Sequence, residues 1–146
     1  MMPASLQVAL FGRIALAAGL GYVIGLERQI RGKAAGDRTF ALLAAGAAAL
    51  VAMAIELFPL SADRVIQGVA TGVGFLGAGV IFRATERPRG LTTAAAAWTA
   101  TAIGVLCGVK LYLVAGLTTV LTILLLESIS LPGLRRFEEE TDQAPD

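Results

Sequence analysis

The chain has 146 residues, of which 56% are hydrophobic and only 16% are charged, and its formal net charge is +1. Soluble domains carry about 45–50% apolar and about 25% charged residues, so this composition indicates a membrane protein instead. The sequence has no histidine and a single cysteine, Cys107, which excludes histidine-based catalysis and an intrachain disulfide.

Five apolar segments, separated by charged or turn-rich breaks, predict five membrane-spanning helices. A span needs about 20 apolar residues, and its backbone groups must be satisfied within the segment, so each is expected to be helical. In chain order the segments are 6–26, 40–58, 65–82, 91–107 and 111–131. The sequence therefore predicts an all-α transmembrane bundle over residues 1–132. The remaining residues, 133–146, are expected to form a short, acidic, disordered cytoplasmic tail.

Lysine and arginine are distributed unequally between the two sets of loops. Nine lie after the first and third segments and in the tail: Arg28, Arg31, Lys33, Arg38, Arg83, Arg87, Arg89, Arg135 and Arg136. Only two, Arg64 and Lys110, lie in the opposite loops. Because basic loops stay on the cytoplasmic side, we expect the N-terminus outside and the C-terminus inside the cell.

Pairs of glycines four residues apart mark one face of three segments. They are Gly21 and Gly25, Gly68 and Gly72, and Gly104 and Gly108. Two helix backbones can approach closely where side chains are missing, so we expect these pairs to be packing contacts, including those of a homodimer. The fifth segment is rich in Leu and Thr, and we expect it at the lipid-facing periphery.

The third segment is the richest in glycine, with Gly68, Gly72, Gly74, Gly77 and Gly79 within 12 residues. Each interior glycine costs about 1 kcal/mol of helix propensity relative to alanine. Such a helix is either clasped by its neighbours or locally unwound so that it lines a cavity. We favour packing, and the sequence leaves the second arrangement open.

Two ionisable residues, Arg13 and Glu56, are expected at similar depth. At 1.5 Å per residue, Arg13 lies about 21 Å from the cytoplasmic boundary at Glu27, and Glu56 lies about 25 Å from the same boundary at Thr39. An unpaired charge in lipid costs at least about 2.5–3.5 kcal/mol, so we predict that the two pair or line one outward-facing pocket. The alternative is that Arg13 snorkels outward alone. Glu127 is expected to pair with a loop arginine.

The densest polar group is expected at the cytoplasmic ends of the first four segments. It comprises Glu27, Arg28, Asp37, Arg38, Thr39, Arg89, Thr92 and Thr93. Carboxylate and hydroxyl oxygens suit Mg²⁺, and Glu27 and Asp37 are the candidate metal ligands. In that interpretation Arg38 holds the carboxylates in place. The alternative, which the residues alone favour, is a salt-bridged structural hinge.

The sequence contains no recognisable catalytic constellation. We find no nucleophile beside a base, no phosphate-binding glycine loop and no cofactor motif, so neither an enzyme nor an organic cofactor is expected. No basic face with interleaved aromatic residues is recognisable either, so nucleic acid is not an expected partner.

Three separated motifs resemble the signatures of the MgtC/SapB membrane family. They are GLERQ at 25–29 with AG at 35–36 and RT at 38–39, GVGFLGAGVI at 72–81, and RGLTTAA at 89–95 followed by Trp98 and Ile103-Gly104. Their order and spacing agree with the family over roughly residues 10–125. Asp37 departs from the pattern, because an apolar residue is expected before Arg-Thr.

The resemblance implies a multi-pass protein of the bacterial inner membrane that is tied to growth under magnesium limitation. It leaves two roles open. One is the movement of Mg²⁺ as a channel or carrier. The other is regulation of another membrane protein, such as the ATP synthase, without ion transport. Many members also carry a soluble cytoplasmic C-terminal domain, and none is expected within these 146 residues.

Overall fold

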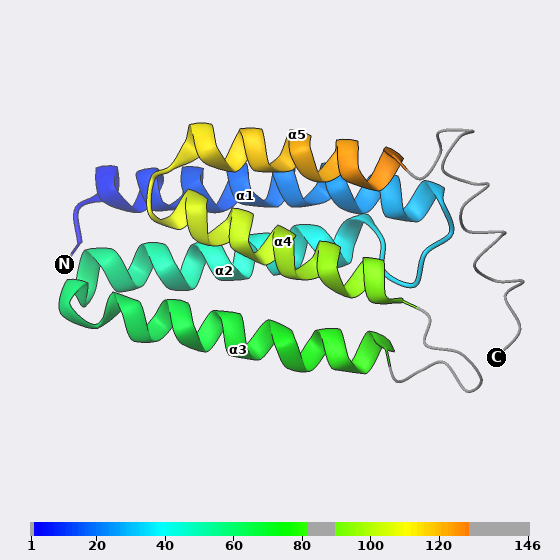
Figure 1. Cartoon of the computed structure of the whole chain (residues 1–146). Helices are drawn as coiled ribbons and strands as arrows, with labels where there is room; N and C mark the ends of the chain where they lie inside the picture. Colours follow the sequence, from blue (N-terminus) through cyan, green and yellow to red (C-terminus); the bar gives the residue numbers. More distant parts are fainter. Residues whose placement is uncertain (1, 82–89, 129–146) are drawn as a thin grey trace, which may run out of the picture.

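The computed structural model of the chain describes residues 2–81 and 90–128, which form five α-helices and one 3₁₀ turn (Figure 1). The elements are α1 (Ala4–Ile30), α2 (Asp37–Leu57), η1 (Pro59–Ser61), α3 (Ala62–Ile81), α4 (Leu91–Gly108) and α5 (Tyr112–Ser128). The predicted all-α bundle is confirmed. Arg83, Arg87, Arg89 and the predicted tail at 133–146 lie outside the described residues.

The helices begin and end a few residues away from the predicted apolar segments. α1 continues past Glu27 and ends at Ile30. Two residues later, Gly32 adopts a left-handed conformation with φ of 63°. The backbone N–H of Gly32 donates to the Gln29 carbonyl, and that of Lys33 donates to the Arg28 carbonyl. This is a Schellman end, which satisfies carbonyls that the last helical turn leaves open. Glu27 and Arg28, the first charged residues after the first apolar segment, are therefore helical.

Three helices, α1, α2 and α4, are long and apolar enough to cross a membrane. α5 is apolar but has only 17 residues, and α3 begins with the charged pair Asp63 and Arg64. Within the described residues, length and apolarity thus support three spans directly, whereas the sequence analysis predicted five.

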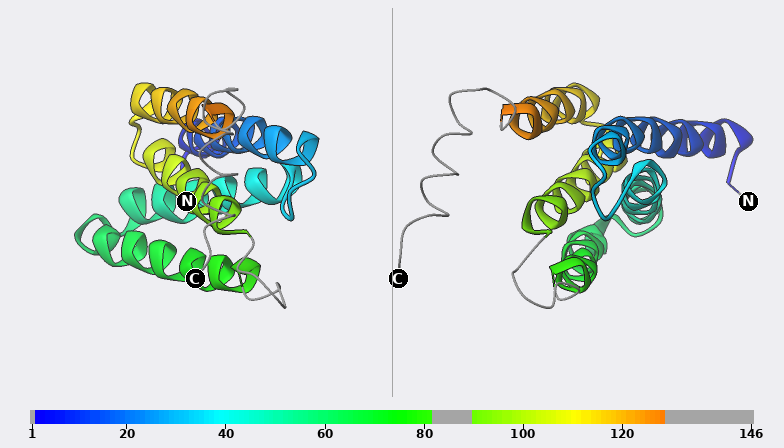
Figure 2. Two further views of the ribbon diagram at one scale, coloured as in Figure 1. Left: turned by 45° about the vertical axis from the view of Figure 1, so that its right-hand side comes forward. Right: turned by 90° about the vertical axis from the view of Figure 1, so that its right-hand side faces the viewer.

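The centre of the bundle is made of α1, α2 and α4, which pack against one another mainly through small residues. Ala17, Ala44, Ala48 and Ala100 are fully buried there, together with the larger Phe40. α3 and α5 lie on opposite sides of this centre (Figures 1 and 2). α5 presents a row of exposed leucines, including Leu113, which agrees with the predicted peripheral position.

The glycines of α1 and α4 are the points of closest approach to α2. A Cβ atom added at Gly21 would lie 2.5 Å from the Phe40 carbonyl oxygen, and one at Gly25 would lie 2.6 Å from the Asp37 Cα. A Cβ at Gly104 would collide with the Ala44 carbonyl, and one at Gly108 would lie 2.9 Å from Val51. Backbone contacts of this kind leave no room for a side chain. These four glycines pack as expected.

The glycines of α3 behave differently from both expectations. α3 is a continuous α-helix over Ala62–Ile81, so it is not unwound. Nothing lies within 4 Å of a Cβ added at Gly68, Gly72, Gly74 or Gly79, and only Gly77 has a neighbour, Ala94, at 3.7 Å. The predicted packing of these glycines against neighbouring helices is therefore not found within one chain, although α3 as a whole packs against α4. The spacing of Gly68, Gly72 and Gly79 places these glycines on one face of α3, and within the described residues no neighbouring helix covers them.

The N-terminal part of α1 runs away from the other helices, as the right-hand view of Figure 2 shows. Val8 and Phe11 are 71% and 69% exposed, and a Cβ at Gly12 would meet nothing within 4 Å. Arg13 is the first buried residue of α1. The first residues of α1 thus stand clear of the bundle.

Candidate functional sites at the two ends of the bundle

An ion pair joins α1 to α2 at the end of the bundle where α2 finishes. Arg13 Nη2 donates to Glu56 Oε1 at 2.8 Å, and Arg13 Nη1 donates to the Gly108 carbonyl at 3.4 Å. Lys110 Nζ lies 3.1 Å from the same Glu56 oxygen. We call Arg13, Glu56 and Lys110 the outer cluster, because the loop charges predict that this end lies outside the cell. The structure brings together the two residues that the depth argument predicted to meet.

The local backbone explains why Lys110 reaches this cluster. α4 ends in a second Schellman motif, in which Lys110 N–H donates to the Cys107 carbonyl and Leu111 N–H donates to the Leu106 carbonyl. Lys110 holds the left-handed position of this motif, with φ of 69°, where glycine is the usual residue. This turn directs the Lys110 side chain toward Glu56, near the end of α2.

The outer cluster places two cations on one carboxylate. Arg13 is only 5% exposed and the Glu56 side chain 20% exposed, whereas Lys110 is 53% exposed. Arg13 therefore does not snorkel outward alone. A carboxylate that already faces two fixed cations is a poor ligand for another cation, so this cluster ties α1, α2 and the α4–α5 turn together.

A second set of charges lies at the opposite end, where α1 finishes. Arg28 donates to both carboxylate oxygens of Glu27, with Nη2 to Oε1 at 2.6 Å, and Arg31 Nε lies 2.8 Å from Glu27 Oε1. Arg31 Nη2 also donates to Glu127 Oε2 at 2.5 Å, which connects α1 to α5. Arg28 is 3% exposed, so Glu27 neutralises a buried guanidinium. Glu127 is thus paired with a loop arginine, as predicted.

The remaining residues of the predicted cluster are not drawn together around a common centre. Asp37 Oδ1 accepts a hydrogen bond from the Arg38 backbone N–H at 2.7 Å. The Arg38 side chain is exposed, and within the described residues it makes no ion pair, so it does not hold Glu27 in place. Thr39 and Thr92 are exposed and Thr93 is buried, while Arg89 lies outside the described residues.

The proposed metal ligands are engaged separately. Glu27 is bound by two arginines and Asp37 by a backbone N–H, so the two carboxylates share no partner. Over residues 2–81 and 90–128, no group of three or more His, Cys, Asp or Glu side chains could hold a metal ion. Among the described residues, the arrangement resembles the salt-bridged hinge more than a cation site.

Two residues of these clusters entered the sequence predictions only through the loop charges that predict the orientation. Arg31 follows Glu27 by four residues, and this spacing brings opposite charges together on one helix face, so the signal was present in the sequence. Lys110 lies just beyond an apolar helix, where a lysine is favourable near the last carbonyls. Its approach to Glu56 depends on the left-handed turn, and a lysine at this position of the sequence does not predict such a turn.

Comparison with known proteins gives a consistent picture of similarity. The profile of the MgtC family matches residues 14–131. "Protein MgtC" of Salmonella typhimurium strain LT2 is 49% identical over 89 residues, which are 61% of this chain and 38% of the relative. "Protein MgtC" of Brucella abortus strain 2308 is 46% identical over 105 residues, 71% of this chain and 44% of the relative. The chain thus covers less than half of these relatives. No solved structure matches it significantly.

Proposed function

The chain belongs to the MgtC family, and from this premise we propose that it is a non-enzymatic membrane protein of magnesium homeostasis in the bacterial inner membrane. The family match over residues 14–131 is the observation that carries this proposal. Three helices with the length and apolarity of membrane spans support the membrane location. The excess of Lys and Arg in alternate loops supports a cytoplasmic position for the end where α1 finishes and α2 begins.

The charge pairing favours a regulatory role over ion transport. Mg²⁺ takes oxygen ligands and gives up its waters reluctantly, so a pathway needs carboxylates that are available to it. Glu56 is shared by Arg13 and Lys110 at one end, and Glu27 is shared by two arginines at the other. We therefore propose that the chain acts by binding another membrane protein, for which the ATP synthase is one candidate.

The proposal includes a homodimer. The glycine contacts of α1 and α4 are already used within one chain, whereas Ala70 and Gly74 of α3, which lie four residues apart on one face outside the contacts with α2, are exposed. Small-residue faces are the usual contacts between helices in lipid, so α3 is the helix that a second copy would use. Crosslinking through single cysteines placed on α3, in a Cys107→Ser background, would test this contact.

Growth at limiting Mg²⁺ tests the physiological part of the proposal. A strain that lacks its own family member should regain growth at limiting Mg²⁺ when it carries this chain. At high Mg²⁺, strains with and without the chain should grow equally well. A growth benefit from the chain at both Mg²⁺ concentrations, or at neither, would count against a role in magnesium homeostasis.

Flux into liposomes separates the two mechanisms. Purified chain, reconstituted with a Mg²⁺-sensitive dye inside the vesicles, should give the same slow signal as empty vesicles. Flux that exceeds this background and falls in the Glu27→Gln variant would identify a carrier and reject the regulatory role.

A further inference from the structure

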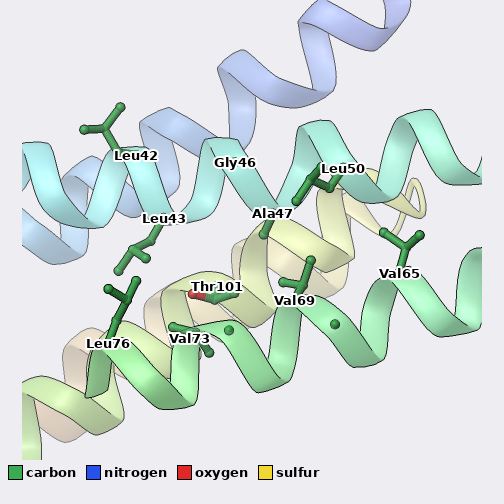
Figure 3. A pocket seen from close by; sticks show the side chains of 12 residues that line it. Leu42, Leu43, Gly46, Ala47, Leu50, Val65, Val69, Val73, Leu76 and Thr101 are labelled. Atoms are coloured by element: carbon green, nitrogen blue, oxygen red, sulfur yellow. The ribbon is translucent and has the colours of Figure 1, made fainter. Parts of the chain in front are cut away.

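An open apolar groove runs between α2 and α3, with α4 beneath it (Figure 3). Its volume is about 480 Å³, which falls in the range of ligand-sized clefts. Aliphatic side chains and glycines line the walls. Leu43 and Leu76 meet at one end, and Leu50 and Val65 lie at the other (Figure 3). The groove therefore follows the helix axes.

Three glycines give the groove its depth. Gly46 on α2 and Gly68 and Gly72 on α3 line it, and a Cβ at any of them would meet nothing within 4 Å. The one polar lining residue is Thr101 of α4, whose hydroxyl donates to the Ala97 carbonyl at 3.0 Å. Because this hydroxyl is already engaged, the interior of the groove suits hydrocarbon and offers little to a polar ligand.

Polar groups begin at the end of the groove where α2 starts. Arg38 and Thr39 precede the lining residues Leu42 and Leu43 by one helical turn, and both are exposed. Residues four apart lie on one helix face, and side chains lean toward the helix N-terminus. The Arg38 guanidinium makes no ion pair within the described residues, and the neighbouring Asp37 carboxylate is occupied by a backbone N–H. A positive charge thus lies on the same face of α2 as the groove, one helical turn beyond it.

The groove and the polar residues one turn beyond it together span about one leaflet of a bilayer. Arg38 to Leu50 spans 12 residues of α2, or about 18 Å at 1.5 Å per residue. Half of a hydrocarbon core that is about 30 Å thick is about 15 Å. A phosphate held at Arg38 would therefore leave its acyl chain beside Leu43, Ala47 and Leu50.

We propose that this groove binds one anionic phospholipid, with the phosphate on Arg38 and Thr39 and an acyl chain between α2 and α3. Guanidinium and hydroxyl are both donors to phosphate oxygens, and guanidinium adds a charge-assisted bond. This site does not depend on the role in magnesium homeostasis. An apolar helix in the groove would need no cation at its mouth, which is why the lipid is the occupant that the charge favours.

Native mass spectrometry of the detergent-purified chain tests the site. Phosphatidylglycerol is titrated against phosphatidylcholine, and the fraction of protein that retains one lipid is measured. Arg38→Gln should weaken phosphatidylglycerol binding about tenfold, the loss expected for one charge-assisted hydrogen bond. Arg64→Gln, at an exposed arginine on α3, should leave it unchanged. Added inorganic phosphate should not displace the lipid.

A second variant tests the apolar part of the groove. Gly72→Leu places a side chain in the groove at a position where a Cβ would meet nothing within 4 Å, and it should reduce retention of phosphatidylglycerol at least tenfold while the melting temperature stays near that of the wild type. Gly19→Leu, at an equally open glycine of α1 outside the groove, is the matched control. Retention that survives both Arg38→Gln and Gly72→Leu would overturn the proposal. So would a dimer that Gly72→Leu converts to monomer, since a second copy would then occupy the groove.

Discussion

Arg13 and Glu56 are 43 residues apart in the sequence and form a 2.8 Å ion pair between α1 and α2. Arg13 has almost no exposed surface, and its second guanidinium nitrogen reaches the carbonyl at the end of α4. One arginine thus holds three helices at one level of the bundle. It is also the first buried residue of α1.

Loss of Glu56 should destabilise the bundle more than loss of Lys110. Glu56→Gln leaves the buried Arg13 without its carboxylate, and an uncompensated buried charge is costly. Thermal unfolding in detergent should show a midpoint several degrees lower than that of the wild type. The double variant Arg13→Met/Glu56→Leu should recover part of this loss, because it removes both charges. A Glu56→Gln variant that melts like the wild type would show that the Arg13–Glu56 pair contributes nothing to thermal stability.

Alanine at the contact glycines should be destabilising, and at the open glycines it should not. At Gly21 and Gly104 the new Cβ would meet the α2 backbone, and overpacking of this kind costs about 1–3 kcal/mol. At Gly19 and Gly68 nothing lies within 4 Å, so alanine should gain up to about 1 kcal/mol of helix propensity. Unfolding in SDS measures both sets. Equal effects at the two sets would contradict the assigned contacts.

Lys110→Gly should be tolerated although it removes a partner of Glu56. A left-handed conformation costs a non-glycine residue about 1–2 kcal/mol. The ion pair that it supports is half exposed, and such pairs contribute about 0–1 kcal/mol. Relief of the backbone therefore offsets the lost charge, and the unfolding free energy should stay the same or rise slightly. Lys110→Ala keeps the left-handed conformation without the charge, so it should be the less stable of the two.

Glu27 and Glu127 share Arg31 but should differ in importance. Glu27→Gln weakens the neutralisation of Arg28, which is buried, and should cost about 3 kcal/mol. Glu127 and Arg31 are both partly exposed, so Glu127→Gln should cost less than about 1 kcal/mol, and added salt should reduce that further. Chemical unfolding at low and high salt distinguishes them. A larger effect at Glu127 would mean that α5 depends on this contact.

The sequence predicts the helices and the outer pair well because both follow from one-dimensional rules. Apolar segment length defines the spans, and a rise of 1.5 Å per residue places Arg13 and Glu56 at one depth. Those rules say nothing about Lys110, because its role depends on the conformation of a single turn.

Glycine spacing was a weaker guide, since it defines a face of a helix and not the neighbour that covers it. Gly104 and Gly72 have the same kind of spacing, yet one touches α2 and the other faces open space. The metal interpretation of Glu27 finds no support in the contacts of the described residues, for a different reason. Two arginines, one adjacent and one four residues on, satisfy the carboxylate within its own helix end. The partners of Glu27 are thus residues close to it in the sequence, and not residues of another helix.

α1 has 27 residues and is about 40 Å long, of which the apolar residues 6–26 account for about 31 Å. A hydrocarbon core about 30 Å thick accommodates this apolar part without mismatch. The last turn of α1, which carries Glu27 and Arg28, therefore extends beyond the hydrocarbon into the headgroup layer. A thicker bilayer should draw this charged turn toward hydrocarbon, so α1 should stand upright there and lean only in thinner bilayers.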